Sequence, residues 1–440
     1  MSVAPATQLS PALERYKQAF ESRFASDRLV DARREALTRF LSVGFPTPRN
    51  EAWKYTNLRR LESRAFSLPT DTPVSIESAQ QQWISGSATR LVFVNGRFGP
   101  ALSQMMPQPP GATVIAFGEW LKHEPERALE YLKASPCEPN ALSDLNTAFA
   151  EDGVVIELAE KAAFDTPVQV VHLWAHAEQP VMSHPRIIIR AGRHSQLTLI
   201  EQYVALGDIE AFTNSVVSVE LQAGAKVEHY RLQQESSRTF HIGQTSVAAQ
   251  EHATYSLRDL SFGGTLSRLN VCARLLGSGS HVDLTGLFTP HGSQHIDAHT
   301  RIEHVAPNTT SQEDYRGIAD GKGRGVFNGK VLVHPGAQKT DARQSSRNLL
   351  LSPTAEIDAK PELEIYANDV KCSHGATTGQ LDSTALFYLR SRGVSESEAR
   401  MMLIRAFAQS IRASIASEPV REYVERLLTA RFADIQRNAA

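Results

Sequence analysis

Two stretches, Arg190-Ala-Gly-Arg-His-Ser-Gln-Leu-Thr-Leu199 and Gln222-Ala-Gly-Ala-Lys-Val-Glu-His-Tyr-Arg231, share one pattern, in which a tight Ala-Gly corner precedes a short strand. Looser copies begin at Pro335 and Pro353. Repeated units of strand, corner and strand are typical of a β-helix or another stacked β-architecture, because each rung buries its inward residues only against its neighbours. A β-sandwich also accommodates this many strand residues, so the repeats leave both folds open.

The repeats lie in the middle one of three segments that differ in composition. Between residues 151 and 382, short runs rich in Val, Ile, Leu and Thr alternate with small-residue turns, which predicts a β core. Residues 1–150 predict helices and mixed elements, with Ser10 and Pro11 placed to start the first helix. Residues 383–440 return to a helical pattern. We therefore expect three domains with these boundaries.

The carboxy-terminal segment carries an apolar helical stripe of Leu403, Phe407 and Ile411. Such a stripe either covers an open end of the β core or docks a partner protein. The pattern alone does not separate these two interpretations.

Charge and hydropathy exclude some classes of function. The chain has 440 residues with 46 basic and 48 acidic side chains, a net charge of −2 that gives no footprint for nucleic acid or an anionic membrane. We find no signal-peptide pattern in the first thirty residues and no apolar stretch long enough to span a bilayer. The expectation is a soluble cytoplasmic protein.

The three cysteines, Cys137, Cys272 and Cys372, are far apart in the sequence, and none belongs to a CxxC motif. This spacing argues against a disulfide framework, and reduced thiols are expected. Cys272 is predicted to be a small hydrophobic residue of the core.

Cys372 differs from the other two because His374 follows two positions later. In a strand, residues i and i+2 point to the same face, so a sulfur and a nitrogen ligand converge there, which suits iron, zinc or an iron–sulfur cluster. Two ligands are too few to close such a site, and the others must come from elsewhere; the alternative is a buried thiol beside a turn histidine. Lys371 and His374 are expected to lower the pKa of the thiol, although Lys371 points to the opposite face.

A second candidate site is the row His295, Asp297 and His299, which faces outward if this segment is a strand with Ile296 and Ala298 inward. These three side chains could ligate a metal, but an outward polar row is also the normal solvated or partner-facing side of a strand.

Signatures of common enzymes are absent from the sequence. There is no P-loop, no GxSxG elbow and no HExxH motif. Asp314, Asp320 and Asp341 provide carboxylates for a β-helix carbohydrate-active enzyme, which is the alternative function.

Several blocks occur in a fixed order: Gly325-Val-Phe-Asn-Gly-Lys-Val331, Gln344-Ser-Ser-Arg-Asn-Leu-Leu-Leu-Ser352, Lys360-Pro-Glu-Leu-Glu-Ile365 and Asp369-Val-Lys-Cys-Ser-His-Gly-Ala-Thr377. Together with Gln294-His-Ile-Asp and Trp53-Lys-Tyr-Thr, they resemble the SufB/SufD family of iron–sulfur cluster assembly proteins. The Lys-Cys-Ser-His form, and the lack of a cysteine-rich amino-terminal segment, are similar to the SufD side of that family.

The resemblance implies a right-handed parallel β-helix flanked by amino-terminal and carboxy-terminal helical domains. It implies a non-catalytic scaffold that pairs with SufB and binds two copies of the ATPase SufC. SufC would dock on residues 383–435, where the stripe of Leu403, Phe407 and Ile411 lies.

The same resemblance implies a transient iron–sulfur cluster shared with SufB, with Cys372 and His374 as this chain's ligands. ATP would act only through SufC, and a reduced flavin would belong to the complex. It also allows a homodimer of the isolated chain, and a purely structural role as a brace for SufB.

Overall fold

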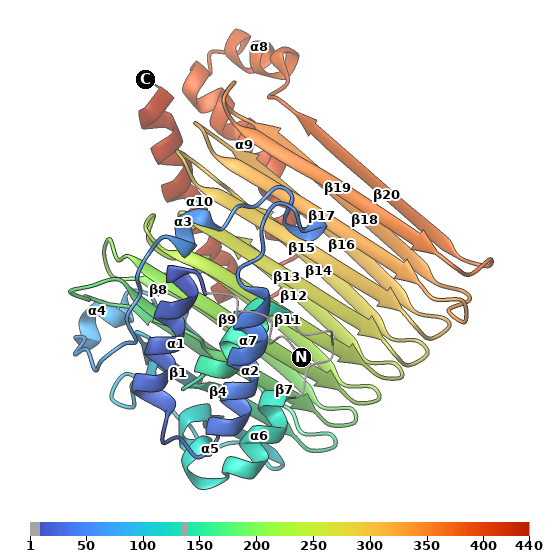
Figure 1. Cartoon of the computed structure of the whole chain (residues 1–440). Helices are drawn as coiled ribbons and strands as arrows, with labels where there is room; N and C mark the ends of the chain where they lie inside the picture. Colours follow the sequence, from blue (N-terminus) through green and yellow to red (C-terminus); the bar gives the residue numbers. More distant parts are fainter. Residues whose placement is uncertain (1–8, 134–136, 138–139, 440) are drawn as a thin grey trace, which may run out of the picture.

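The core of the molecule is a β-solenoid of about eight turns that spans residues 153–379. The computed structural model describes residues 9–133, 137 and 140–439, with side chains described as far as residue 433. Figure 1 shows the strands stacked in chain order, from green in the lower half to orange at the upper end. From Arg186 to Gly379, successive strands alternate between two sheets and pair in parallel within each, so the solenoid prediction is confirmed and the β-sandwich alternative is wrong.

Each sheet contains one strand from every turn. The first, called sheet 1, runs in the order β2 (Arg97–Phe98), β1 (Thr89–Val94), β5 (Val168–Trp174), β8 (Gln196–Ala205), β10 (Lys226–Gln234), β12 (Thr254–Ser261), β14 (His281–Phe288), β16 (Thr310–Ala319), β18 (Asp341–Leu350) and β20 (Lys371–Gly379). Sheet 2 runs in the order β19 (Glu356–Ile365), β17 (Arg324–Val333), β15 (His295–His304), β13 (Leu266–Leu275), β11 (Phe240–Ala249), β9 (Ala211–Leu221), β7 (Arg186–Ala191), β4 (Gly153–Leu158) and β3 (Ala112–Ala116), with β6 (Val181–Ser183) paired to β9.

The two repeated stretches of the sequence lie one above the other in adjacent turns. Leu197 of β8 is in register with Val227 of β10, and both side chains are buried in the solenoid interior. At the corner before β10, Gly224 has φ +70°, and a Cβ there would lie 2.2 Å from the ring of His194 in the turn below. The Ala-Gly corner is therefore required by close stacking of turns as well as by backbone conformation.

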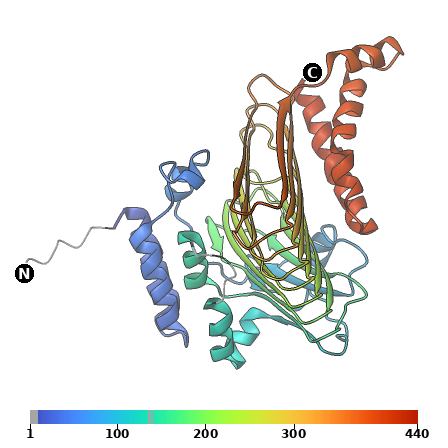
Figure 2. The same cartoon turned by 90° about the vertical axis from the view of Figure 1, so that its right-hand side faces the viewer.

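Helices cover the outer faces of both sheets, on opposite sides of the solenoid (Figure 2). On sheet 2, aromatic residues of α1 (Pro11–Phe24), α2 (Val30–Val43) and α7 (Ala141–Phe149) form one apolar cluster with Phe212 and Phe240. On sheet 1, α9 (Glu396–Ala413) and α10 (Glu418–Ala439) form another. The shorter helices are η1 (Glu51–Trp53), α3 (Arg59–Glu62), α4 (Ile76–Gln80), α5 (Phe117–His123), α6 (Pro125–Lys133) and α8 (Ser383–Ser391). None of the helices described is long and apolar enough to cross a bilayer.

Two of the three cysteines are joined, which corrects the expectation of reduced thiols throughout. Cys137 and Cys272 form a disulfide with a Cα–Cα distance of 6.3 Å across 135 positions of sequence. Cys272 lies between Val271 and Ala273, which point into the interior, so its own side chain points outward and is not part of the solenoid core as predicted. Spacing in the sequence could not reveal this contact, because the chain folds back over the outside of sheet 2.

Candidate functional site

The carboxy-terminal end of the solenoid has two strands with an unpaired edge, β19 and β20. In the part of the chain that the structure describes, β20 pairs only with β18 and β19 pairs only with β17. Lys371 N–H donates to Thr340 of the preceding turn at 2.8 Å. Because alternate residues of a parallel strand bond the same neighbour, the backbone groups of Cys372, His374, Ala376 and Thr378 point to the free edge.

Cys372 and His374 face the same way, as the sequence predicts. They are in register with Ala342 and Gln344 of β18, which are buried in the solenoid interior. The pair therefore lies on the inward face of the last strand, where the next turn would cover it. His374 is exposed at this end, whereas Cys372 is only partly exposed.

The surroundings of Cys372 are apolar, in contrast to those of His374. Its side chain packs against a small cluster that contains Val331, Val333 and Ala342. Burial raises the pKa of the thiol, and the Asp341 carboxylate raises it further. The prediction of a lowered pKa is therefore wrong, and Cys372 presents less thiolate at neutral pH than an ordinary cysteine.

The row of His295, Asp297 and His299 faces outward on β15 as predicted. Side chains of the same chain already contact His295 and Asp297. Asp297 accepts hydrogen bonds from Arg268 at 2.8 Å and from Thr56 at 2.5 Å, and the Thr56 hydroxyl lies 2.8 Å from Nε2 of His295. Burial lowers the pKa of His299 to about 4 and also lowers that of His295.

These contacts indicate that the row binds the amino-terminal segment of the same chain. The Arg268 guanidinium lies 3.8 Å from the centre of the Trp53 ring, so the Trp53-Lys-Tyr-Thr56 block is the segment that this face of sheet 2 holds. Among the residues that the structure describes, no group of three or more His, Cys, Asp or Glu side chains is placed to hold a metal ion. A metal at His295, Asp297 and His299 stays a prediction that these contacts do not favour.

Comparison with known proteins agrees with the resemblance in the ordered blocks. A family model described as SUF system FeS cluster assembly, SufBD core domain, matches residues 173–407, and a model of the SufBD protein N-terminal region matches residues 9–170. An iron–sulfur cluster assembly SufBD family protein of Synechocystis sp. is 33% identical over 415 residues, which is 92% of each chain. The iron–sulfur cluster assembly protein SufD of Escherichia coli is 30% identical over 417 residues, which is 94% of this chain and 95% of that protein.

The chain belongs to the SufBD family.

The family blocks at residues 325–331, 344–352 and 369–377 form the last turns of the solenoid, on β17, β18 and β20. The last of these blocks forms the open end that carries Cys372 and His374. The second block includes Gln344, which was not predicted as a site residue.

The apolar stripe proposed for partner docking is mostly used within this SufBD chain. Ile411 is 1% exposed and packs on sheet 1 together with Ile404, whereas Leu403 and Phe407 are partly exposed. Larger exposed apolar side chains lie nearby, with Phe387 and Tyr388 on α8 exposed by 72% and 57%. These two were not predicted as site residues; the signal in the sequence was two adjacent aromatic residues, and α8 buries none of its side chains in the structure.

The carboxylates of the alternative enzyme interpretation do not form a cluster. Asp341 is in register with Thr310, four residues before Asp314 along β16, which separates the two by about 13 Å along the strand. Each has a basic neighbour, Arg343 for Asp341 and Arg316 for Asp314. Asp320 lies beyond the end of β16, so the structure does not bring the three together for glycoside chemistry.

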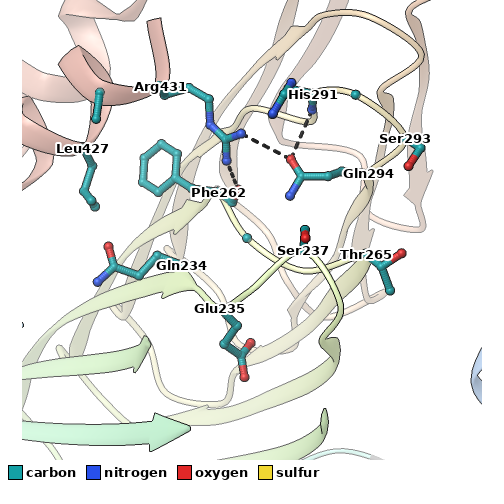
Figure 3. Close-up of a pocket in the computed structure, with 13 residues that line it drawn as sticks. Gln234, Glu235, Ser237, Phe262, Thr265, His291, Ser293, Gln294, Leu427 and Arg431 are labelled. Atoms are coloured by element: carbon teal, nitrogen blue, oxygen red, sulfur yellow. Dashed lines mark hydrogen bonds between the residues drawn. The ribbon is translucent and has the colours of Figure 1, made fainter. Parts of the chain in front are cut away.

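A cavity of about 430 Å³ lies between α10 and the turns of the solenoid. Figure 3 shows hydrogen bonds among part of its lining: Gln294 Oε1 accepts from the His291 backbone at 3.2 Å and from Arg431 at 3.4 Å, and Arg431 also donates to the carbonyl of Phe262. These contacts hold α10 against the solenoid at Arg431. No site was predicted here from the sequence.

Proposed function

We propose that this chain is a non-catalytic scaffold subunit of the SUF machinery, which pairs with SufB and binds SufC so that an iron–sulfur cluster is built at its junction with SufB. The observation that carries the proposal is the open carboxy-terminal end of the solenoid. A strand edge with unpaired backbone groups is a ready template for another strand. Here that edge coincides with the inward row of Cys372 and His374.

Pairing between β20 and a strand of SufB satisfies the free backbone groups and also supplies the ligands that the pair lacks. His374 is the more available of the two, because Cys372 packs in an apolar cluster and its thiol has a raised pKa. We therefore assign His374 as the principal ligand of this chain and Cys372 as a second ligand that needs rearrangement of the edge to bind.

The exposed aromatic pair of α8 supports a docking site for SufC in the carboxy-terminal helical region. Solvent-exposed large apolar side chains that lie together are typical of protein interaction surfaces. In this proposal SufC binds Phe387 and Tyr388, together with Met402 of the neighbouring helix α9, which is 51% exposed, in place of the buried Ile411. Closure of SufC on ATP then pulls on α8 and α9 and rearranges the SufB junction. A reduced flavin would bind to the assembled complex.

The test is anaerobic co-purification of the full chain with candidate SufB and SufC, followed by absorption and Mössbauer spectroscopy of any bound cluster. We expect His374→Ala to lower cluster content strongly and Cys372→Ala to lower it less, with SufC still bound. Thr378→Ala, on the same inward face of β20, is the matched control. Normal cluster content in both the His374 and the Cys372 variants would favour a brace that takes no part in ligation.

Docking of SufC is tested separately. Phe387→Ser should weaken SufC binding without loss of SufB. The control is Met106→Ser, which changes a side chain of 46% exposure in the amino-terminal segment. Equal SufC binding by the two variants would contradict this site.

A further inference from the structure

His374 stands at the end of a column of interior side chains that runs through sheet 1. In-register pairing places His229, Leu257, Leu284, Glu313 and Gln344 in turn beneath it. The column is apolar at Leu257 and Leu284, and then becomes polar over the last turns before the open end. Both polar residues are buried, with Glu313 exposed by 2% and Gln344 by 4%.

Only one end of the Gln344 amide has a hydrogen-bond partner among the described residues. Its Nε2 donates to Glu313 Oε2 at 2.7 Å. Its Oε1 is buried and accepts no hydrogen bond from the residues that the structure describes. A buried acceptor without a hydrogen-bond partner costs about 1–3 kcal/mol of stability. An amide whose oxygen is unpaired is therefore less favourable at this position than Leu, which occupies the same column in two earlier turns.

The opposite sheet makes room for this amide. A Cβ on Gly329 of β17 would lie 2.2 Å from Nε2 of Gln344. The lack of a Cβ at Gly329 therefore leaves the space in which the Gln344 amide reaches Glu313. The position next to Gln344 on the open side of the column belongs to His374, one strand spacing of about 4.8 Å away.

We infer that Gln344 and Glu313 form a relay that positions the His374 imidazole: Glu313 orients the Gln344 amide, and Gln344 Oε1 accepts the N–H of one ring nitrogen. The other ring nitrogen is then left with its lone pair free for iron. This inference rests on the proposed role of His374 as a ligand. Gln344 is a positioning residue here, because it acts through His374.

The physical basis is the usual support of a metal-binding histidine. A carbonyl or carboxylate acceptor on the distal N–H fixes the tautomer and orientation of the ring and raises its basicity, and loss of such a partner typically lowers metal affinity about 10–100-fold. His229, in the same column, shows how an imidazole is fixed inside this solenoid: Glu201 lies 2.8 Å from its Nε2 and Tyr255 lies 2.9 Å from its Nδ1.

The first readout is the ring of His374 in the full-length chain. Histidine side chains are labelled with ¹⁵N, and the His374 signals are assigned by their loss in His374→Gln. We expect one dominant tautomer in the unaltered chain and a mixture of tautomers in Gln344→Leu. Asn348→Leu is the matched control, because it removes a buried amide from the same strand in the column that ends at Thr378. Unchanged ring shifts in Gln344→Leu would overturn the inference.

Two further variants keep the test decisive if Gln344→Leu does not fold. Gly329→Ala should disturb the tautomer by displacing the amide. The exchange Glu313→Gln with Gln344→Glu should restore it, because an amide then donates to a carboxylate that accepts from His374. Failure of both variants to behave in this way would also overturn the relay.

The second readout is Fe²⁺ binding by the anaerobic complex with SufB. Gln344→Leu should lower the affinity about 10–100-fold, whereas Asn348→Leu should not. If His374→Ala has no effect on cluster content while Gln344→Leu still changes the tautomer, the relay stands and the assignment of His374 as a ligand fails. If His374→Ala abolishes the cluster and Gln344→Leu changes neither the ring nor the affinity, the relay fails and the proposed function stands.

Discussion

The two ends of the solenoid are built differently. At the amino-terminal end, β1 is covered by the antiparallel strand β2 and β4 by the antiparallel strand β3. At the carboxy-terminal end, no strand among the described residues lies beyond β19 or β20, and Tyr366 nearby is 61% exposed. Antiparallel strands cannot continue a parallel solenoid, so they close one end, whereas the other end keeps its edges open. An open strand edge promotes aggregation in a protein that acts alone, but it provides a binding surface in a protein that pairs with another chain.

The solenoid interior also differs between the half next to the amino-terminal end, called the closed half, and the half next to the carboxy-terminal end, called the open half. The difference lies in the partners of their buried carboxylates. In the closed half, burial alone would raise the pKa of Glu201, but His229 and Arg231 outweigh it and hold this pKa at about 2. In the open half, no basic side chain among the described residues offsets the burial of Glu313, and burial raises its pKa to about 7. The buried carboxylate of the closed half thus has basic partners, whereas the partners of Glu313 are a neutral amide and a hydroxyl.

The largest expected effect on stability concerns the disulfide between Cys137 and Cys272. Reduction of Cys137–Cys272, or replacement of both residues with Ser, should lower the free energy of unfolding by about 4 kcal/mol, because the bond closes a loop of 135 positions. Cys372, at the open end, should react with a thiol reagent in the folded chain without reductant. Denaturant unfolding with and without reductant measures the first effect; equal midpoints would contradict it.

A cavity made in the interior of the closed half should cost slightly less. Leu257 is fully buried in the column that ends at His374, so Leu257→Ala should destabilise the chain by about 3 kcal/mol. Cys372→Ala, on the inward face of the open end, should cost less than about 1 kcal/mol, because the surroundings of Cys372 are incomplete. Urea unfolding of both variants checks the contrast, and equal losses would show that the open end is as tightly packed as the middle.

The titration of Glu313 gives a smaller effect that depends on pH. Because the folded chain holds the proton of Glu313 more tightly than the unfolded chain, the contribution of Glu313 to stability is greatest below about pH 4.5 and is lost as pH rises through about 7. Glu313→Gln should remove this dependence and gain on the order of 2 kcal/mol over the unaltered chain at pH 8. Thermal unfolding at pH 5 and pH 8 measures the difference. A gain of the same size at both pH values would argue against a buried ionising group.

The fold was largely predictable from the sequence, and the reason is local. The Ala-Gly corner occurs in two adjacent turns and apolar runs recur along the solenoid, and the inward positions of Ile296 and Ala298 follow from strand alternation alone. The shared face of Cys372 and His374 was predictable for the same reason.

Contacts between distant segments were not predictable in this way. The disulfide joins positions 135 apart, and Asp297 is occupied by Thr56, which lies 241 residues earlier. The raised pKa of Cys372 depends on Val331 and Val333 of the other sheet. Gln344 was quoted as part of a family block, but its relation to His374 needs the register between β18 and β20.

The smallest effect on the isolated chain, and the most direct test of the comparison, comes from a proline on the open edge. The Ala376 N–H points to the free edge, so Ala376→Pro should leave the β18 ladder intact and change the stability of the chain by less than about 1 kcal/mol. It should still weaken SufB binding about tenfold or more, because a partner strand loses a hydrogen bond there. Thr377→Pro is the matched control, because its N–H belongs to the ladder with β18, so it should destabilise the chain itself. SufB pull-down and urea unfolding of both variants separate the two effects: if Ala376→Pro binds SufB as tightly as the unaltered chain, the open edge is not the surface that pairs.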